Sequence, residues 1–137
     1  MLFITRRERF SAAHKLWNIA LSNEENNHIF GKCAYPNSHG HNYQIFITVK
    51  GEINAKSGYV IDAKSLKAIL KKYIIDKTDH RNLNMDVDFL ENTNPTIENL
   101  LVKFWEQIEA PIKAEGCNLH KIKLIETENN YGEYYGE

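Results

Sequence analysis

Two histidines two positions apart, His39 and His41, are the residues of this sequence best suited to metal chemistry. The residues that follow them, Tyr-Gln-Ile-Phe-Ile-Thr-Val over 43–49, have the composition of a β-strand. Positions i and i+2 of a strand share a face, so both imidazoles should project from one side at the start of this strand. A catalytic zinc commonly has three protein ligands and one open position. The pair therefore predicts two arms of a metal site, and a third ligand must lie elsewhere.

His14 is the best candidate for the third ligand. It lies near the end of a predicted strand over residues 3–16, on the same face as Phe10 by alternation. If this strand pairs with the next as an antiparallel hairpin, the end of one lies beside the start of the other, which would bring His14 to His39 and His41. Three histidines with one open position form a catalytic zinc arrangement. A solvated histidine at a strand end is the alternative.

Cys33 lies six residues before His39, and the turn-forming Pro36 and Asn37 between them could fold the thiol back toward the metal. Three roles are open to it. It could be a fourth ligand that closes a structural site, or a reactive thiolate that acts as nucleophile or base. It could also be a small buried residue. Cys117 has no histidine beside it and is expected to be buried and inert.

Two further acidic positions could serve acid–base chemistry or binding. Asp79 and His80 are adjacent in a polar loop, where a carboxylate can orient an imidazole as general acid or base, or both can simply be solvated. Glu126 shares a strand face with Ile122 and Leu124. A carboxylate on an apolar face needs a partner or binds a ligand, and two oxygens suit a heterocycle with an N–H beside an amino group. An exposed strand end is the alternative for Glu126.

The elements that must position these groups are mostly strands. Besides the strand over 3–16, the sequence predicts strands over 43–50, 59–61, 119–128 and 131–135. Residues 18–27 are expected to form a loop with room for one helical turn, and residues 78–84 a second polar loop.

Two amphipathic helices separate the third and fourth of these strands. The first begins after the N-cap Asp62 and has apolar residues at helical spacing over 66–74. The second opens with Asn94 as N-cap and Pro95 at its first position, and ends before Pro111. The order has no βαβ alternation. We therefore expect an α+β fold, with an antiparallel sheet and two helices packed on one face.

The composition indicates one domain over residues 1–137. With 42% hydrophobic and 26% charged residues, the chain can bury a core without disulfides. The formal net charge of −1 provides no basic field, so neither nucleic acid nor an anionic membrane is expected as a partner. The N-terminal segment is charged from Arg6 onward, which is too early for a signal peptide, and no apolar run is long enough for a bilayer. We expect a cytoplasmic protein with reduced thiols.

Five segments resemble, in order, those of the 6-pyruvoyltetrahydropterin synthase family, and they cover nearly the whole chain. They are Phe-Ser-Ala-Ala-His over 10–14, Gly-Lys-Cys over 31–33 with Pro-Asn-Ser-His-Gly-His-Asn-Tyr over 36–43, Asp-His-Arg-Asn-Leu-Asn over 79–84, Asn-Pro-Thr-Ile-Glu-Asn over 94–99 and Glu-Thr-Glu-Asn-Asn over 126–130. The resemblance implies the tunnelling fold (T-fold), a four-stranded antiparallel sheet with two helices on one side. It also implies a homohexamer, a dimer of trimers in which each trimer joins its sheets into a barrel, with active sites between subunits.

The same resemblance implies the roles of individual residues. They are the Zn2+ ligands His14, His39 and His41, the catalytic groups Cys33, Asp79 and His80, the pterin anchor Glu126, and the pocket-lining Thr96 and Glu98. The implied enzyme is a zinc-dependent carbon–oxygen lyase of tetrahydrobiopterin synthesis. It converts 7,8-dihydroneopterin triphosphate into 6-pyruvoyltetrahydropterin and triphosphate, with no nicotinamide or flavin.

Other readings of the same motifs remain. A bacterial branch of the family, the 6-carboxytetrahydropterin synthases of queuosine synthesis, uses the same substrate but releases acetaldehyde as well as triphosphate. The five residues between Cys33 and His39 resemble the pyruvoyl branch, whereas Tyr-Val-Ile-Asp over 59–62 resembles the bacterial one. A third branch, of folate synthesis, has glutamate in place of the cysteine, and Cys33 argues against it. A non-catalytic zinc domain, closed by Cys33 as a fourth ligand, is the second alternative.

Overall fold

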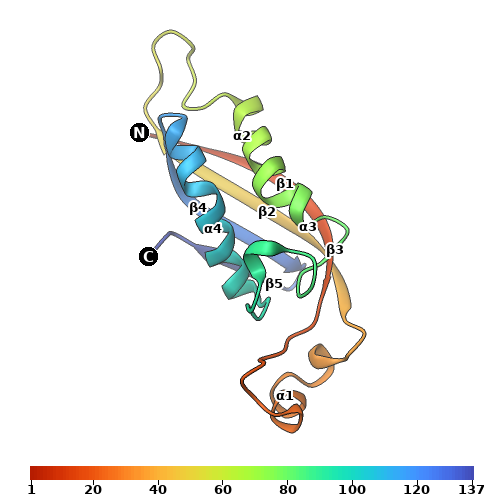
Figure 1. The fold of residues 1–137 in the computed structure, drawn as a ribbon. Helices are drawn as coiled ribbons and strands as arrows, with labels where there is room; N and C mark the ends of the chain where they lie inside the picture. Colours follow the sequence, from red (N-terminus) through yellow and green to blue (C-terminus); the bar gives the residue numbers. More distant parts are fainter.

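A five-stranded sheet in the order β3-β1-β2-β4-β5 underlies the structure, a computed structural model that describes residues 1–137 (Figure 1). The strands are β1 (Leu2–His14), β2 (His39–Gly51), β3 (Arg81–Asn82), β4 (Asn118–Thr127) and β5 (Asn130–Tyr134). The four longer strands pair antiparallel, as predicted. The fifth, β3, was not predicted. It consists of two residues of the expected 78–84 loop, which pair parallel to β1 at its outer edge.

The hairpin of β1 and β2 is the longest pairing in the sheet. Its register runs without interruption from Leu2 opposite Gly51 to His14 opposite His39. Alternation sends Phe10 and His14 of β1 to the buried face, together with every second residue of β2 from Tyr43 onward. The hairpin predicted from the sequence is therefore present in the register that brings its histidines together.

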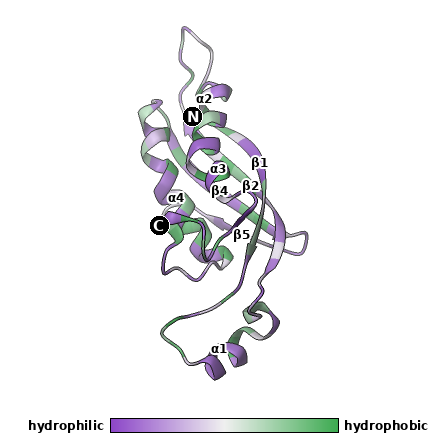
Figure 2. Cartoon of the chain, turned by 45° about the vertical axis from the view of Figure 1, so that its right-hand side comes forward, coloured by the Kyte–Doolittle hydropathy of each residue, from purple (hydrophilic) through white to green (hydrophobic).

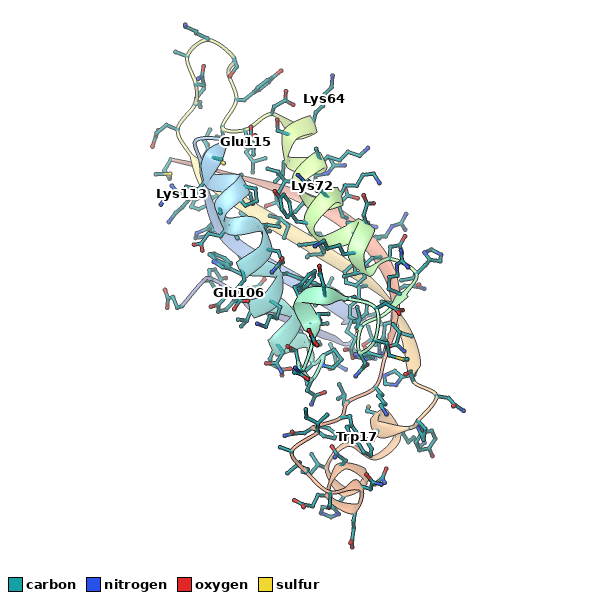
Figure 3. The ribbon with its side chains drawn as sticks, in the orientation of Figure 1. Trp17, Lys64, Lys72, Glu106, Lys113 and Glu115 are labelled. Atoms are coloured by element: carbon teal, nitrogen blue, oxygen red, sulfur yellow. The ribbon has the colours of Figure 1, made fainter.

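Two helical segments cover one face of this sheet (Figure 1). The first comprises α2 (Ala63–Leu70), a π-helical turn η2 (Lys71–Ile75) and α3 (Asp76–Thr78). The second is α4 (Ile97–Ala114), preceded by a short 3-10 helix η3 (Asp88–Leu90). Figure 2 shows the apolar sides of these elements turned inward, and in Figure 3 Lys64 and Lys72 point away from the sheet. A cluster of 24 buried residues fills the space between the layers, so one core serves the whole sheet.

The helix ends confirm one predicted cap and correct two other predictions. The carboxylate of Asp62 accepts from the N–H of Lys64 at 2.7 Å, as an N-cap should. The cap of α4 is Thr96 rather than Asn94, because the Asn94 side chain instead accepts from the N–H of Trp17. Pro111 lies inside α4 rather than beyond it. The helix continues because Ile112, in its last turn, is fully buried and packing outweighs the lost hydrogen bond.

The predicted strand over 59–61 is absent. The carbonyl of Tyr59 closes a turn by accepting from the N–H of Asn54 at 2.8 Å, and Ile61 is buried in the core. The segment is apolar because the Ile61 side chain packs in the core, and it does not form a strand of the sheet.

A helix also occupies part of the segment expected to be a loop with one helical turn. Helix α1 (Asn23–Phe30) begins with a capping box of Ser22 and Glu25, and the 3-10 helix η1 (Gly31–Ala34) follows it. The segment projects from the sheet where β1 and β2 end (Figure 1). The capping box was readable in the sequence, but α1 has no apolar stripe because only Asn26 is buried in it.

None of the helices combines the length and the apolar character needed to cross a membrane.

Candidate metal and substrate site

Three histidines meet where the β1–β2 hairpin opens. His14 at the end of β1 lies opposite His39 at the start of β2, and His41 follows on the same face. The ring centroid of His14 lies 4.7 Å from that of His39 and 5.1 Å from that of His41. One ring nitrogen from each histidine lies within 4.8 Å of the other two. The structure therefore brings together the three side chains that the sequence singled out, in a group that could hold a metal ion.

The surroundings lower the pKa of two of these histidines and orient one of them. His14 is 1% exposed, and burial lowers its pKa from 6.5 to about 4. Its Nδ1 lies 2.9 Å from the carbonyl oxygen of Pro95, so the neutral ring donates there and turns its Nε2 lone pair toward the cluster. Burial, opposed in part by Glu126, also lowers the pKa of His41. Neutral imidazole is the form that binds a metal.

One buried nitrogen of the cluster makes no hydrogen bond within the protein. Nε2 of His41 is buried and makes no hydrogen bond. A buried polar atom without a partner is costly, and an ion shared by the three rings would satisfy it. The donor set and this atom fit a metal ion that prefers imidazole nitrogen.

Glu126 of β4 completes one wall of the site. Its Oε1 lies 3.7 Å from Nε2 of His41 and its Oε2 lies 4.0 Å from Nε2 of His14. The carboxylate is 19% exposed, so it faces both the cluster and solvent. Tyr43, two residues beyond His41, lies beneath, and its hydroxyl is 3.4 Å from Nδ1 of His14. Burial raises the pKa of Tyr43, which keeps the phenol neutral.

Sequence reasoning missed Tyr43 as part of the site, although alternation from His41 could have found it. It also missed the Pro95 carbonyl, because a backbone group that comes from another element leaves no signal in the local sequence.

Cys33 lies in η1, and its carbonyl oxygen accepts from the N–H of Leu16 at 2.7 Å. The thiol is partly exposed, and its sulfur is outside the group of potential ligand atoms formed by the three histidines. The group of potential ligand atoms therefore comprises three nitrogens and no thiolate. Cys117 is buried as expected, and burial raises its pKa.

Asp79 and His80 form a pair at the outer edge of β1. Asp79 Oδ1 accepts from the N–H of Ser11 at 2.9 Å and lies 3.1 Å from Nδ1 of His80. The hydrogen bond from Ser11 and the contact with His80 lower the pKa of Asp79, so it is ionised at neutral pH. The His80 backbone has a left-handed φ of 60°, held by its N–H bond to the Ser11 carbonyl. Its side chain is 84% exposed and stands apart from the three-histidine cluster.

Thr96 and Glu98 lie at the start of α4 but differ in their relation to the cluster. Thr96 follows Pro95, whose carbonyl contacts His14, and its hydroxyl caps α4 by accepting from the N–H of Asn99. Glu98 is exposed and lines a separate groove with Tyr131. Only Thr96 is thus tied to the histidine site within one chain.

Comparison with known proteins gives a consistent result over the whole chain. The family model described as 6-pyruvoyl tetrahydropterin synthase matches residues 3–137. The 6-pyruvoyl tetrahydrobiopterin synthases of Dictyostelium discoideum and Homo sapiens are 43% and 42% identical to this chain. They cover 99% and 98% of it, and the matches span 97% and 91% of those proteins.

The solved structure of Caenorhabditis elegans 6-pyruvoyl tetrahydropterin synthase superposes with a TM-score of 0.92 at 37% identity, covering 99% of this chain and 96% of the other. A shorter match, 43% identical over 53 residues and 36% of each chain, joins it to a 6-carboxy-5,6,7,8-tetrahydropterin synthase of Haemophilus influenzae. The α+β architecture is the T-fold, with one added two-residue strand. On its sequence, its fold and the full length of the match, the chain belongs to the 6-pyruvoyl tetrahydropterin synthase family.

Proposed function

We propose that this chain is a zinc-dependent lyase that converts 7,8-dihydroneopterin triphosphate into 6-pyruvoyltetrahydropterin and triphosphate. The observation that carries the proposal is the cluster of three histidines beside Glu126, in which one buried nitrogen makes no hydrogen bond. Family membership supplies the reaction class, and the cluster supplies a place for it.

His14, His39 and His41 would hold the zinc ion, since imidazole nitrogens are among its preferred ligands and no thiolate joins the group. The bound ion would supply Lewis acidity, which makes protons beside oxygen-bearing carbons easier to remove. The Pro95 carbonyl keeps His14 in the tautomer that presents Nε2.

Glu126 would bind the pterin. A ring N–H beside an amino group offers two parallel donors, and the two carboxylate oxygens match them. Because Glu126 is only 19% exposed, such a bond would form in a poorly hydrated setting, where it is strong. Thr96 and Glu98 would line the rest of the substrate pocket.

Cys33 would move one proton at a side-chain carbon of the substrate, and His80 would move a second. Asp79 orients His80 by its contact with Nδ1, which leaves Nε2 free to exchange a proton with a ligand. The left-handed backbone that presents His80 to solvent supports a role in a contact beyond its own chain.

A homohexamer, a dimer of trimers, would bring that contact about. The outer edge of β1 is covered by β3 only at Ala12 and Ala13, so its backbone from Leu2 to Phe10 has no partner on that side. Leu2, Phe3 and Ile4 of the same strand are also exposed. An open strand edge with apolar side chains is suited to pairing with another copy, and β5 offers the opposite edge. We place this assembly in the cytoplasm, where the two unpaired cysteines would stay reduced.

The second candidate reaction is that of a 6-carboxy-5,6,7,8-tetrahydropterin synthase of queuosine synthesis, which acts on the same substrate. The partial match to the Haemophilus influenzae enzyme favours it, but that match covers 36% of the chain, against 98–99% for the pyruvoyl relatives. The third candidate, a non-catalytic zinc domain closed by Cys33, is disfavoured by the position of the sulfur outside the cluster.

Incubation of the zinc-loaded protein with 7,8-dihydroneopterin triphosphate, followed by mass spectrometry, distinguishes these candidates. A 6-pyruvoyl product supports the proposal, and a 6-carboxy product with acetaldehyde replaces it by the second candidate. Zinc bound without any product would contradict both reactions. Metal analysis of Cys33→Ala completes the test, because retained zinc with lost turnover identifies a catalytic thiol and lost zinc identifies a structural ligand.

A further inference from the structure

A short strap, residues 15–17, leaves His14 and is tied to three different parts of the chain. The N–H of Lys15 donates to Asn84 Oδ1 at 2.8 Å, that of Leu16 to the Cys33 carbonyl at 2.7 Å, and that of Trp17 to Asn94 Oδ1 at 3.1 Å. Figure 3 shows Trp17 in the part of the molecule that projects beyond the sheet. Three successive backbone groups thus connect the strap to the loop after β3, to η1 and to the segment before α4.

The strap has no neighbouring strand to pair with. His14 and His39 form the last residue pair between β1 and β2, and beyond it the two segments are no longer paired. Asn84 takes the place of a strand on this side, since its Nδ2 also donates to the Lys15 carbonyl at 2.9 Å. One side-chain amide therefore satisfies both backbone groups of Lys15, as a paired strand residue would.

The strap also links two parts of the proposed site. The strap follows His14 directly in the sequence, and the N–H of its middle residue, Leu16, donates to the carbonyl of Cys33. Asn94 supports the same arrangement from the other side, because the next residue, Pro95, orients the His14 ring. The Asn94 carbonyl is itself held by the side chain of Asn99 at 2.8 Å.

We propose that Asn84 and Asn94 are positioning residues that set the place of the Cys33 thiol relative to the three-histidine cluster. The inference rests on the proposed function, in which Cys33 and the cluster act on one substrate. Proton transfer depends steeply on geometry, and a displacement of about 1 Å can reduce the rate about 10²-fold. Neither amide needs to touch the substrate for this effect.

The test uses Asn84→Ala and Asn94→Ala in the zinc-loaded, full-length protein. We expect kcat to fall roughly 10- to 100-fold with KM within about threefold, while zinc content stays at the wild-type level. Asn84→Asp should lie between Asn84→Ala and wild type, because it keeps the acceptor for Lys15 N–H and loses the donor to its carbonyl. Asn27→Ala is the matched control, an exposed asparagine in α1 whose side chain makes no hydrogen bond.

A second readout does not depend on turnover. The rate at which iodoacetamide alkylates Cys33, followed by peptide mass spectrometry, should rise at least about threefold in Asn84→Ala and stay unchanged in Asn27→Ala, since local opening exposes the thiol. If wild type is inactive but this rate responds, the proposed function fails and the positioning role stands. If Asn84→Ala does not fold, Asn84→Asp and Asn94→Ala carry the same comparison. Alkylation and kcat at control levels, or a kcat loss that only follows loss of zinc or of folded protein, would overturn the proposal.

Discussion

At the scale of single residues, the site depends on how one histidine is buried. His14 is deeply buried, and its hydrogen bond to the Pro95 carbonyl orients its ring. His39 and His41 are only partly buried. Removing any of the three rings would leave too few ligands, but His14→Ala also leaves a buried cavity.

We expect His14→Ala to reduce zinc affinity by roughly 10²-fold or more, because the loss of an outer contact alone costs 10- to 100-fold. Equilibrium dialysis followed by metal analysis measures this. His120→Ala, which removes a histidine that packs at an angle against Phe3 and is not in the cluster, is the control and should bind zinc as wild type does. Undiminished zinc in His14→Ala would remove that residue from the ligand set.

The depressed pKa of His14 predicts how the metal-free protein responds to acid. The folded pKa is about 4 and the unfolded value 6.5, so the unfolded chain binds more protons between these limits. The contribution of His14 to the free energy of unfolding is therefore fully present above pH 6.5. It is lost as the pH falls toward 4, which lowers the free energy of unfolding by roughly 3 kcal/mol. His39, His41 and Glu126 face the same ring.

Urea unfolding of the metal-free protein at intervals from pH 7 to pH 4 measures this dependence. His14→Gln should give a flatter profile, because it removes the titrating ring. An equally steep profile in His14→Gln would assign the acid sensitivity to the other groups.

At the scale of elements, the caps that start the helices are local features with tertiary consequences. Asp62 starts α2, which leads through η2 and α3 to Asp79 and His80. Asp62→Ala removes an acceptor from the first turn and should lower the free energy of unfolding by about 1 kcal/mol. Chemical denaturation checks this against Glu109→Ala, an exposed position in α4 that should change little. A loss no larger than that of the control would show that packing alone starts the helix.

At the scale of the whole molecule, the separation of the Asp79–His80 pair from the histidine cluster is the main consequence of the fold. The pair stands at a sheet edge with His80 exposed, and in the proposed hexamer it would act in a site shared with a second copy. A hexamer would have six times the 15.9 kDa of the chain, about 95 kDa, which light scattering can measure.

Mixing inactive variants tests where the pair acts. Cys33→Ala and His80→Ala should each lack activity, and after joint refolding about a quarter of the sites should combine an intact Cys33 with an intact His80 from different chains. Recovered turnover near that fraction supports a shared site. No recovery, with mixed hexamers present, would contradict it.

The sequence by itself determined the pattern of alternation, the hairpin, the cap of α2 and the three histidines, because each depends on residue type and short spacing. The proximity of His14 and His39 followed because, in an antiparallel hairpin, the end of the first strand lies beside the start of the second. Tertiary structure decided what depends on distant partners. Burial of Ile112 allows α4 to continue beyond Pro111. Asn94 does not cap α4 because its side chain accepts a hydrogen bond from the N–H of Trp17. Contact with Ser11 placed Asp79 and His80 at the edge of β1, outside the three-histidine group, and no local pattern in the sequence contains that contact.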